Sequence, residues 1–301
     1  MKKTFSLLFA VTVSLAAPSA FAALNVLACE PEWAALATEI GADRIKASSA
    51  TTALQDPHRI EARPSLIART RNADLLVCTG LELEVGWLPI LLQQSGNAKI
   101  APGQPGNFEA GSVVARLDIP TRLDRSDGDV HAAGNPHIQQ DPRNILKVAE
   151  ALTRRLTEID APNAAFYQSR LANFAGRWTA AMQKWDQQLA PLKGTPVVEH
   201  HKNMEYLLSW AGLRQVGALE PKPGVEPSAA HLNELLGQLQ RQPAKMVLRA
   251  AYQDGRASEW LSQHARIPAV VLPFTVGGDE RAKDLFSLFD DTVARLLEAA
   301  K

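Results

Sequence analysis

A single long helix is the strongest constraint that this sequence places on its fold. Between Pro162 and Leu192 the only glycine is Gly176, and no further proline occurs until Pro191. At about 1.5 Å per residue this segment would span about 45 Å, which is longer than one compact lobe needs. We therefore predict a stiff helix over 161–192 that links two lobes. Its apolar residues recur at the spacing of an amphipathic helix: Phe166, Leu171, Phe174, Trp178, Met182, Trp185 and Leu189.

Strand-like and helix-like segments alternate on both sides of this helix. LNVLA, EWAALATEIG, ADLLVC and LEVGWLPILLQQSG precede it, while VVEHH, EYLLSWAGL, AKMVLRA, AVVLPF and a last helix in AKDLFSLFDDTVARLLEA follow it. Such alternation is typical of α/β folds with parallel sheets. We expect an N-terminal α/β lobe over 23–160, the linking helix over 161–192 and a C-terminal α/β lobe over 193–301.

The first 22 residues predict a secretory signal peptide. Two lysines precede an apolar run, and the small-residue pattern AFA ends at Ala22, so we expect cleavage before Ala23 and export to the periplasm. A membrane anchor would need about 20 unbroken apolar residues. Lipid attachment at Cys29 is disfavoured because the cleavage site lies ahead of it.

The charges of the chain are balanced. It has 32 basic and 32 acidic residues, and loss of the signal peptide removes two of the lysines. A net charge so close to zero gives no electrostatic reason to expect nucleic acid or an anionic membrane as a partner.

The two cysteines occupy matching places in the N-terminal lobe. Cys29 ends the strand-like segment LNVLAC, and Cys78 ends ADLLVC. If these strands are neighbours in a parallel sheet, their ends lie about 5 Å apart, within the range that a disulfide tolerates. We expect a Cys29–Cys78 disulfide in an oxidising compartment; two free buried thiols are the alternative.

Three of the seven histidines lie in loops near the predicted sheet edges. His58 and His137 each follow a proline, and His201 ends the segment VVEHH. Three imidazoles from separate loops suit zinc, whereas manganese prefers more carboxylate oxygen. An isolated histidine is more often a surface or hydrogen-bonded residue, so spacing alone leaves both interpretations open.

The sequence motifs around these histidines are more specific. DPHxxxxxPS contains His58, GDVHxxGNPHxxxDPxN contains His137, and HKxxxYL contains His201 after the long helix. In this order they closely resemble the periplasmic solute-binding proteins of zinc and manganese ABC transporters, over the whole mature chain. The resemblance implies a zinc site formed by these three histidines in a cleft between the lobes.

The same resemblance implies a role in transport. A member of this family passes its metal to an ABC permease in the inner membrane and catalyses no reaction. We expect a monomer, with a periplasmic zinc chaperone as a further candidate partner.

The remaining histidines are expected to serve other roles. Alternation along a strand points His200 and His201 to opposite faces, so we expect His200 to pack or to support the site. His231 and His264 lie on predicted helices, and we expect them to be solvated or capping residues. His131 is a candidate auxiliary ligand, because a long histidine- and acid-rich loop found in many zinc-binding relatives is missing here; an ordinary loop histidine fits equally well.

The fourth metal ligand is the least determined. The strand VVLPFT lacks an acid that some relatives carry near its end. Asp279, after two glycines and before the final helix, would complete a tetrahedral site. An aspartate at that place is also a favoured helix N-cap, and both roles stay open.

Three other functions are consistent with parts of the pattern. A manganese-binding member of the same family would use the same fold. A secreted zinc hydrolase would need a general base such as Glu199 or Glu82, but no HExxH motif is present. A surface adhesin of this fold would be expected to carry a lipid anchor.

Overall fold

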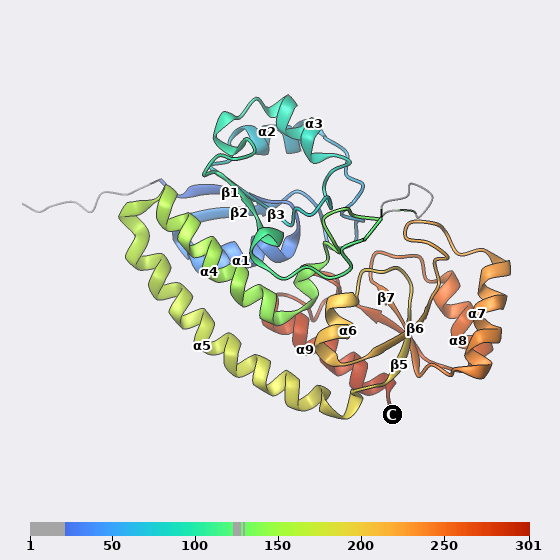
Figure 1. Ribbon diagram of the computed structural model, residues 1–301. Helices are drawn as coiled ribbons and strands as arrows, with labels where there is room; N and C mark the ends of the chain where they lie inside the picture. Colours follow the sequence, from blue (N-terminus) through green and yellow to red (C-terminus); the bar gives the residue numbers. More distant parts are fainter. Residues whose placement is uncertain (1–21, 123–127, 129) are drawn as a thin grey trace, which may run out of the picture.

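The computed structural model describes residues 22–122, 128 and 130–301. The predicted signal peptide lies outside this range, apart from its last residue. The described chain forms two four-stranded sheets, each with helices on both faces, and all strand pairs are parallel (Figure 1). In this part of the chain we find no helix that is both long and apolar enough to cross a membrane.

The N-terminal sheet has the strand order β2-β1-β3-β4. Helices α2 and α3 cover one face, and α1 and α4 cover the other (Figure 1). Successive residues of β1 serve the two cores in turn, because Val26 packs on the α1 side and Leu27 on the α2 side. The elements are β1 (Leu24–Ala28), α1 (Pro31–Gly41), β2 (Ile45–Ser49), α2 (Pro64–Arg71), β3 (Leu75–Cys78), α3 (Leu88–Ser95), β4 (Asn107–Glu109) and α4 (Pro142–Ile159).

The C-terminal sheet repeats this arrangement with the order β6-β5-β7-β8. Helices α7 and α8 cover one face, and α6 and α9 pack on the other. The elements are β5 (Pro196–Glu199), α6 (Glu205–Ala211), β6 (Arg214–Ala218), α7 (Ala229–Arg241), β7 (Met246–Ala250), α8 (Arg256–Ala265), β8 (Ala269–Leu272) and α9 (Leu285–Ala299).

The predicted long helix is α5, Ala164–Leu189, with a short 3-10 turn at each end. It runs from the N-terminal lobe to the C-terminal lobe and packs on α1, α4 and α9 (Figure 1). Trp185 stacks on Phe289 of α9 with ring centroids 5.1 Å apart, and Trp178 lies 5.2 Å from Trp185. One apolar core therefore extends through both lobes along α5. The predicted fold class is confirmed.

The Cys29–Cys78 disulfide is present, as predicted. Strands β1 and β3 are parallel neighbours, with Ala28 opposite Val77, so the next residue of each strand reaches the same sheet edge. The two Cα atoms are 4.7 Å apart, and both cysteines are buried.

Candidate metal centre

His58 lies in the loop between β2 and α2, and Asp56 fixes its ring. Oδ1 of Asp56 accepts the backbone N–H of His58 at 3.0 Å and lies 2.7 Å from its Nδ1. Burial alone would raise the pKa of Asp56, but the hydrogen bond from His58 lowers it overall. With Nδ1–H donated to this carboxylate, Nε2 is left for a ligand; it is buried and has no hydrogen-bond partner among the described residues.

His137 lies in the segment that leads into α4. Its backbone N–H donates to Oδ1 of Asn135 at 3.0 Å, and its side chain is almost wholly buried. Burial lowers the pKa of His137 well below the usual value, and the rings of His58 and His201 act in the same direction. The imidazole is therefore neutral at physiological pH, which is the state that binds a metal.

His201 follows β5 at the carboxyl edge of the second sheet. Its Nδ1 lies 2.6 Å from Oε2 of Glu220. That oxygen also accepts the backbone N–H of Gly224 at 2.7 Å, which fixes the carboxylate. As at His58, a carboxylate holds one ring nitrogen and leaves the other for a metal.

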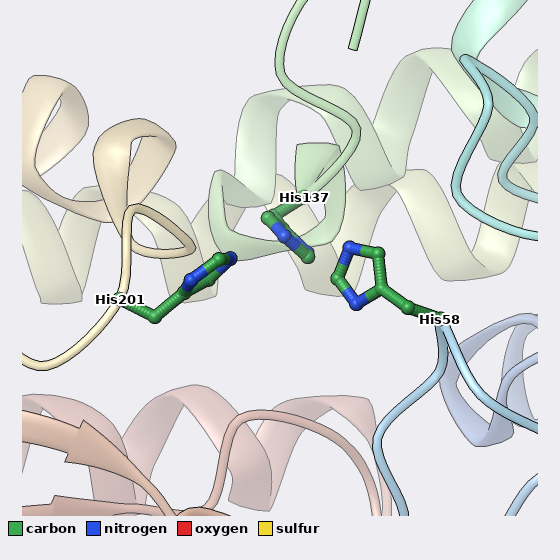
Figure 2. Close-up of side chains that lie close together, drawn as sticks. All are labelled: His58, His137 and His201. Carbon is green, nitrogen blue, oxygen red and sulfur yellow. The ribbon is translucent and has the colours of Figure 1, made fainter. Parts of the chain in front are cut away.

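The three rings converge from different parts of the chain (Figure 2). One nitrogen of each ring lies within 4.8 Å of the others, and the ring centroids are 5.4 to 6.0 Å apart. Tetrahedral zinc with bonds of about 2.0 to 2.1 Å places its nitrogen ligands about 3.4 Å apart. Small side-chain rotations would therefore bring the imidazoles onto one ion.

The site connects with two cavities. One of about 300 Å³ is lined by His131, His137 and His201, and one of about 1080 Å³ is lined by His58, His131 and Glu82. The ring of His131 stacks on that of His58 at 5.4 Å, but His131 is not part of the group of converging nitrogens. It therefore lines both cavities that border the three converging rings.

The other histidines are used elsewhere. His200 is buried, its Nε2 lies 3.9 Å from Glu220, and it does not belong to the converging group. His231 Nε2 lies 3.0 Å from the carbonyl oxygen of Ala218. His264 stacks on Trp260, with its Nδ1 2.7 Å from the carbonyl oxygen of the same residue.

The structure does not bring Asp279 into the group of converging ligands. Its Oδ2 forms an ion pair of 2.6 Å with Arg295 of α9, and its Oδ1 accepts the backbone N–H of Arg281 at 3.0 Å. It does not cap α9 either, because Asp284 is the N-cap. The sequence-based expectation overlooked Arg295, which lies on the far side of the turn and takes up the charge of Asp279.

Comparison with known proteins gives one family. A family model described as ZnuA, zinc-uptake complex component A, periplasmic, matches residues 26–299. ScaA, a manganese ABC transporter substrate-binding lipoprotein of Streptococcus gordonii, is 23% identical over 268 residues, which is 87% of this chain and 83% of that protein. The high-affinity zinc uptake system protein ZnuA of Yersinia pestis is 25% identical over 196 residues, 61% of each chain.

The fold agrees with the family. A crystal structure of ZnuA matches with a TM-score of 0.77 at 22% identity, covering 93% of this chain and 100% of that one. The family consists of substrate-binding transport proteins, so the alternative of a hydrolase is excluded. Because the family model spans nearly the whole described chain, this protein belongs to the ZnuA family of metal-binding, substrate-binding proteins of ABC transporters.

Proposed function

We propose that this protein captures Zn²⁺ in the periplasm through His58, His137 and His201 and delivers it to an ABC permease in the inner membrane. The convergence of three imidazole nitrogens within 4.8 Å carries this proposal. Two of the rings are oriented by carboxylates, and no carboxylate oxygen of the described chain joins the converging group. An all-nitrogen donor set favours zinc over manganese, which prefers oxygen.

Metal titration of the mature protein tests the ligand set. Alanine at position 58, 137 or 201 should each weaken Zn²⁺ binding by at least about tenfold, since loss of even an outer partner of a ligand costs that much. His200→Ala is the matched control and should bind Zn²⁺ like the wild type. Equal damage from His200→Ala and His201→Ala would contradict the assignment.

Manganese is the second candidate metal, because ScaA and other relatives carry manganese in their names. Competition between Zn²⁺ and Mn²⁺ at equal concentration distinguishes the two. Retention of Mn²⁺ in preference to Zn²⁺ would overturn the zinc proposal.

Export and assembly belong to the same proposal. A signal peptide cleaved before Ala23 predicts a secreted protein that begins at this residue, which mass spectrometry of the periplasmic fraction measures. The protein should sediment as a monomer. His131 and a periplasmic zinc chaperone are candidates for assisting metal capture, with His131→Ala expected to slow loading more than it weakens equilibrium binding.

A further inference from the structure

Three buried glutamates of the N-terminal lobe lie outside the group of converging histidines. Glu30, Glu32 and Glu84 have exposed fractions of 3%, 1% and 2%. Burial raises the pKa of each, to about 7 for Glu32 and Glu84 and well above the usual value for Glu30. Neither a lysine nor an arginine of the described chain is among the groups that shift these three pKa values.

Such a cluster is costly unless something offsets it. Buried carboxyl groups are normally paired with a cation, bound to a metal or kept neutral. Here hydroxyl and amide donors satisfy only part of the cluster. Oε1 of Glu30 is buried and accepts no hydrogen bond from an amide or hydroxyl group of the described chain, and the carboxyl groups of Glu30 and Glu84 are hydrogen-bonded to each other.

The disulfide completes a set of metal-binding atoms. The Sγ atoms of Cys29 and Cys78 and a carboxylate oxygen of Glu84 all lie within 4.8 Å of one another, and all three residues are buried. Thr79 joins the two carboxyls to the set, because its N–H donates to Glu84 at 2.7 Å and its hydroxyl donates to Glu30 at 3.1 Å. Two sulfurs and a carboxylate oxygen form a donor set suited to zinc.

We propose that reduction of the Cys29–Cys78 disulfide opens a second metal site, in which both sulfurs and Glu84 bind a thiophilic divalent cation such as Zn²⁺, with Glu30 as the candidate fourth ligand. A dithiol reductant supplies two electrons and two protons, so that the S–S bond becomes two thiols and the dithiol becomes a disulfide. Metal binding then displaces both thiol protons. The cation offsets two of the three negative charges of the two thiolates and the buried carboxylate.

The site can be reached from solvent. A cavity of about 440 Å³ is lined by Cys78, Glu84 and the exposed side chains of Val85 and Glu109. In an oxidising compartment the disulfide withholds both sulfur ligands, and the histidine site is the only one of the two that can bind a metal. The redox state of Cys29 and Cys78 thus sets the metal capacity of the protein.

Titration of the mature protein with Co²⁺ tests this proposal, because sulfur ligands give near-ultraviolet charge-transfer bands that imidazole ligands do not. Phosphine-reduced protein should bind two equivalents and show these bands; oxidised protein should bind one and show none. Glu84→Gln keeps an acceptor for the N–H of Thr79 and should weaken the second site at least about tenfold. Glu158→Gln, on the exposed face of α4, is the control and should leave the second site unchanged.

Several outcomes would overturn the proposal. One is a reduced, folded protein without the sulfur bands; another is a Glu84→Gln variant that binds as tightly as the wild type. If reduction unfolds the metal-free chain, circular dichroism should show that Zn²⁺ restores the wild-type fold but not that of Glu84→Gln, and a failure to restore it contradicts the site. A triple alanine variant at positions 58, 137 and 201 should retain the bands, so the second site is tested independently of the proposed zinc transport.

Discussion

The phenol of Tyr206 donates a 3.0 Å hydrogen bond to the carbonyl oxygen of Asn135, which connects the segments of two proposed ligands. Asn135 in turn donates from its Nδ2 to the carbonyl oxygen of Lys202 at 3.0 Å, and accepts the N–H of His137. The segment of His137 and the segment of His201 are therefore joined by two hydrogen bonds, one donated by Tyr206 and one by Asn135, and these fix the two histidines relative to each other. This explains the spacing of the motif HKxxxYL, whose tyrosine never needs to touch the metal.

Loss of this hydroxyl should loosen the site without removing a ligand. Tyr206→Phe deletes two hydrogen bonds, the one donated to the carbonyl oxygen of Asn135 and one accepted from the N–H of Leu117. The bond to Asn135 has a net value of about 1 kcal/mol, so its loss alone should lower Zn²⁺ affinity about fivefold. Competition against a chromophoric chelator measures the change. Tyr167→Phe removes the same atom from α5, where it bonds to Asp160, and should leave affinity unchanged. Wild-type affinity in Tyr206→Phe would show that the coupling is irrelevant to binding.

Glu220 makes a stronger contribution because it contacts a ligand ring directly. Glu220→Gln replaces an anionic acceptor with a neutral amide, so the Nδ1–H of His201 is held less firmly and the ring is oriented less well towards a metal. We expect Zn²⁺ affinity to fall by about 10- to 100-fold. Isothermal titration calorimetry gives the constant, with the exposed Glu234→Gln on α7 as the control. An unchanged constant would mean that His201 is oriented by its packing alone.

The sequence predicted the inner strands better than the outer ones. The inner strands β1, β3, β5 and β7 contain apolar runs, because their residues are largely buried on both faces. The edge strand β8 (AVVL) is also apolar, although two of its four residues are only half-buried. The edge strands β2 (IKASS) and β6 (RQVGA) consist mainly of polar or small residues and are mostly half-exposed, so no apolar pattern marks them. Their existence follows from pairing with β1 and β5, which is a tertiary property.

The residues of the metal centre also differ in how well the sequence alone predicts them. His58, His137 and His201 were identified because local motifs surround them. Glu220 lies 19 residues beyond its partner His201, outside the motifs that surround the three histidines. The glutamate cluster is not marked by any motif either, because Glu30, the N-cap residue of α1, and Glu32, in its first turn, look like ordinary acids at a helix N-terminus until the fold buries them.

The same burial makes stability depend on pH. Glu32, which accepts a hydrogen bond from Thr275, has its pKa raised by burial from 4.5 to about 7. Between these two pH values the folded state keeps a proton on Glu32 that the unfolded state releases. The contribution of protonated Glu32 to stability is therefore complete below pH 4.5 and is lost as the pH rises through 7.

Glu32→Gln should flatten this dependence. In the wild type, ionisation of Glu32 should lower the free energy of unfolding by about 3 kcal/mol between pH 4.5 and 8. The amide cannot ionise, so the variant should not show this part of the decrease. Urea unfolding of the oxidised protein at several pH values measures the difference. Glu234→Gln should follow the wild-type curve, and a parallel curve for Glu32→Gln would show that Glu32 is ionised throughout.

Asp279 takes part in structural contacts and does not lie among the proposed metal ligands. Its hydrogen bond with the backbone of Arg281 and its ion pair with Arg295 lower its pKa to about 2, so it carries a full charge at neutral pH and is already paired. Arg295 also pairs with the buried Asp291 at 2.7 Å, so the turn before α9 is held by a small network of charges. A carboxylate engaged in this way is a poor source of a fourth metal ligand.

We therefore expect Asp279→Ser to bind Zn²⁺ with wild-type affinity and to lower the melting temperature by about 1 to 3 °C, the size of effect that a partly exposed ion pair gives in a chain of this length. Serine keeps an oxygen that can accept the N–H of Arg281 but removes the charge that pairs with Arg295. Arg295→Gln breaks the same pair from the other side and should lower the melting temperature without weakening the site. A loss of Zn²⁺ affinity of tenfold or more in Asp279→Ser alone would show that the aspartate leaves Arg295 and joins the three histidines when the metal binds.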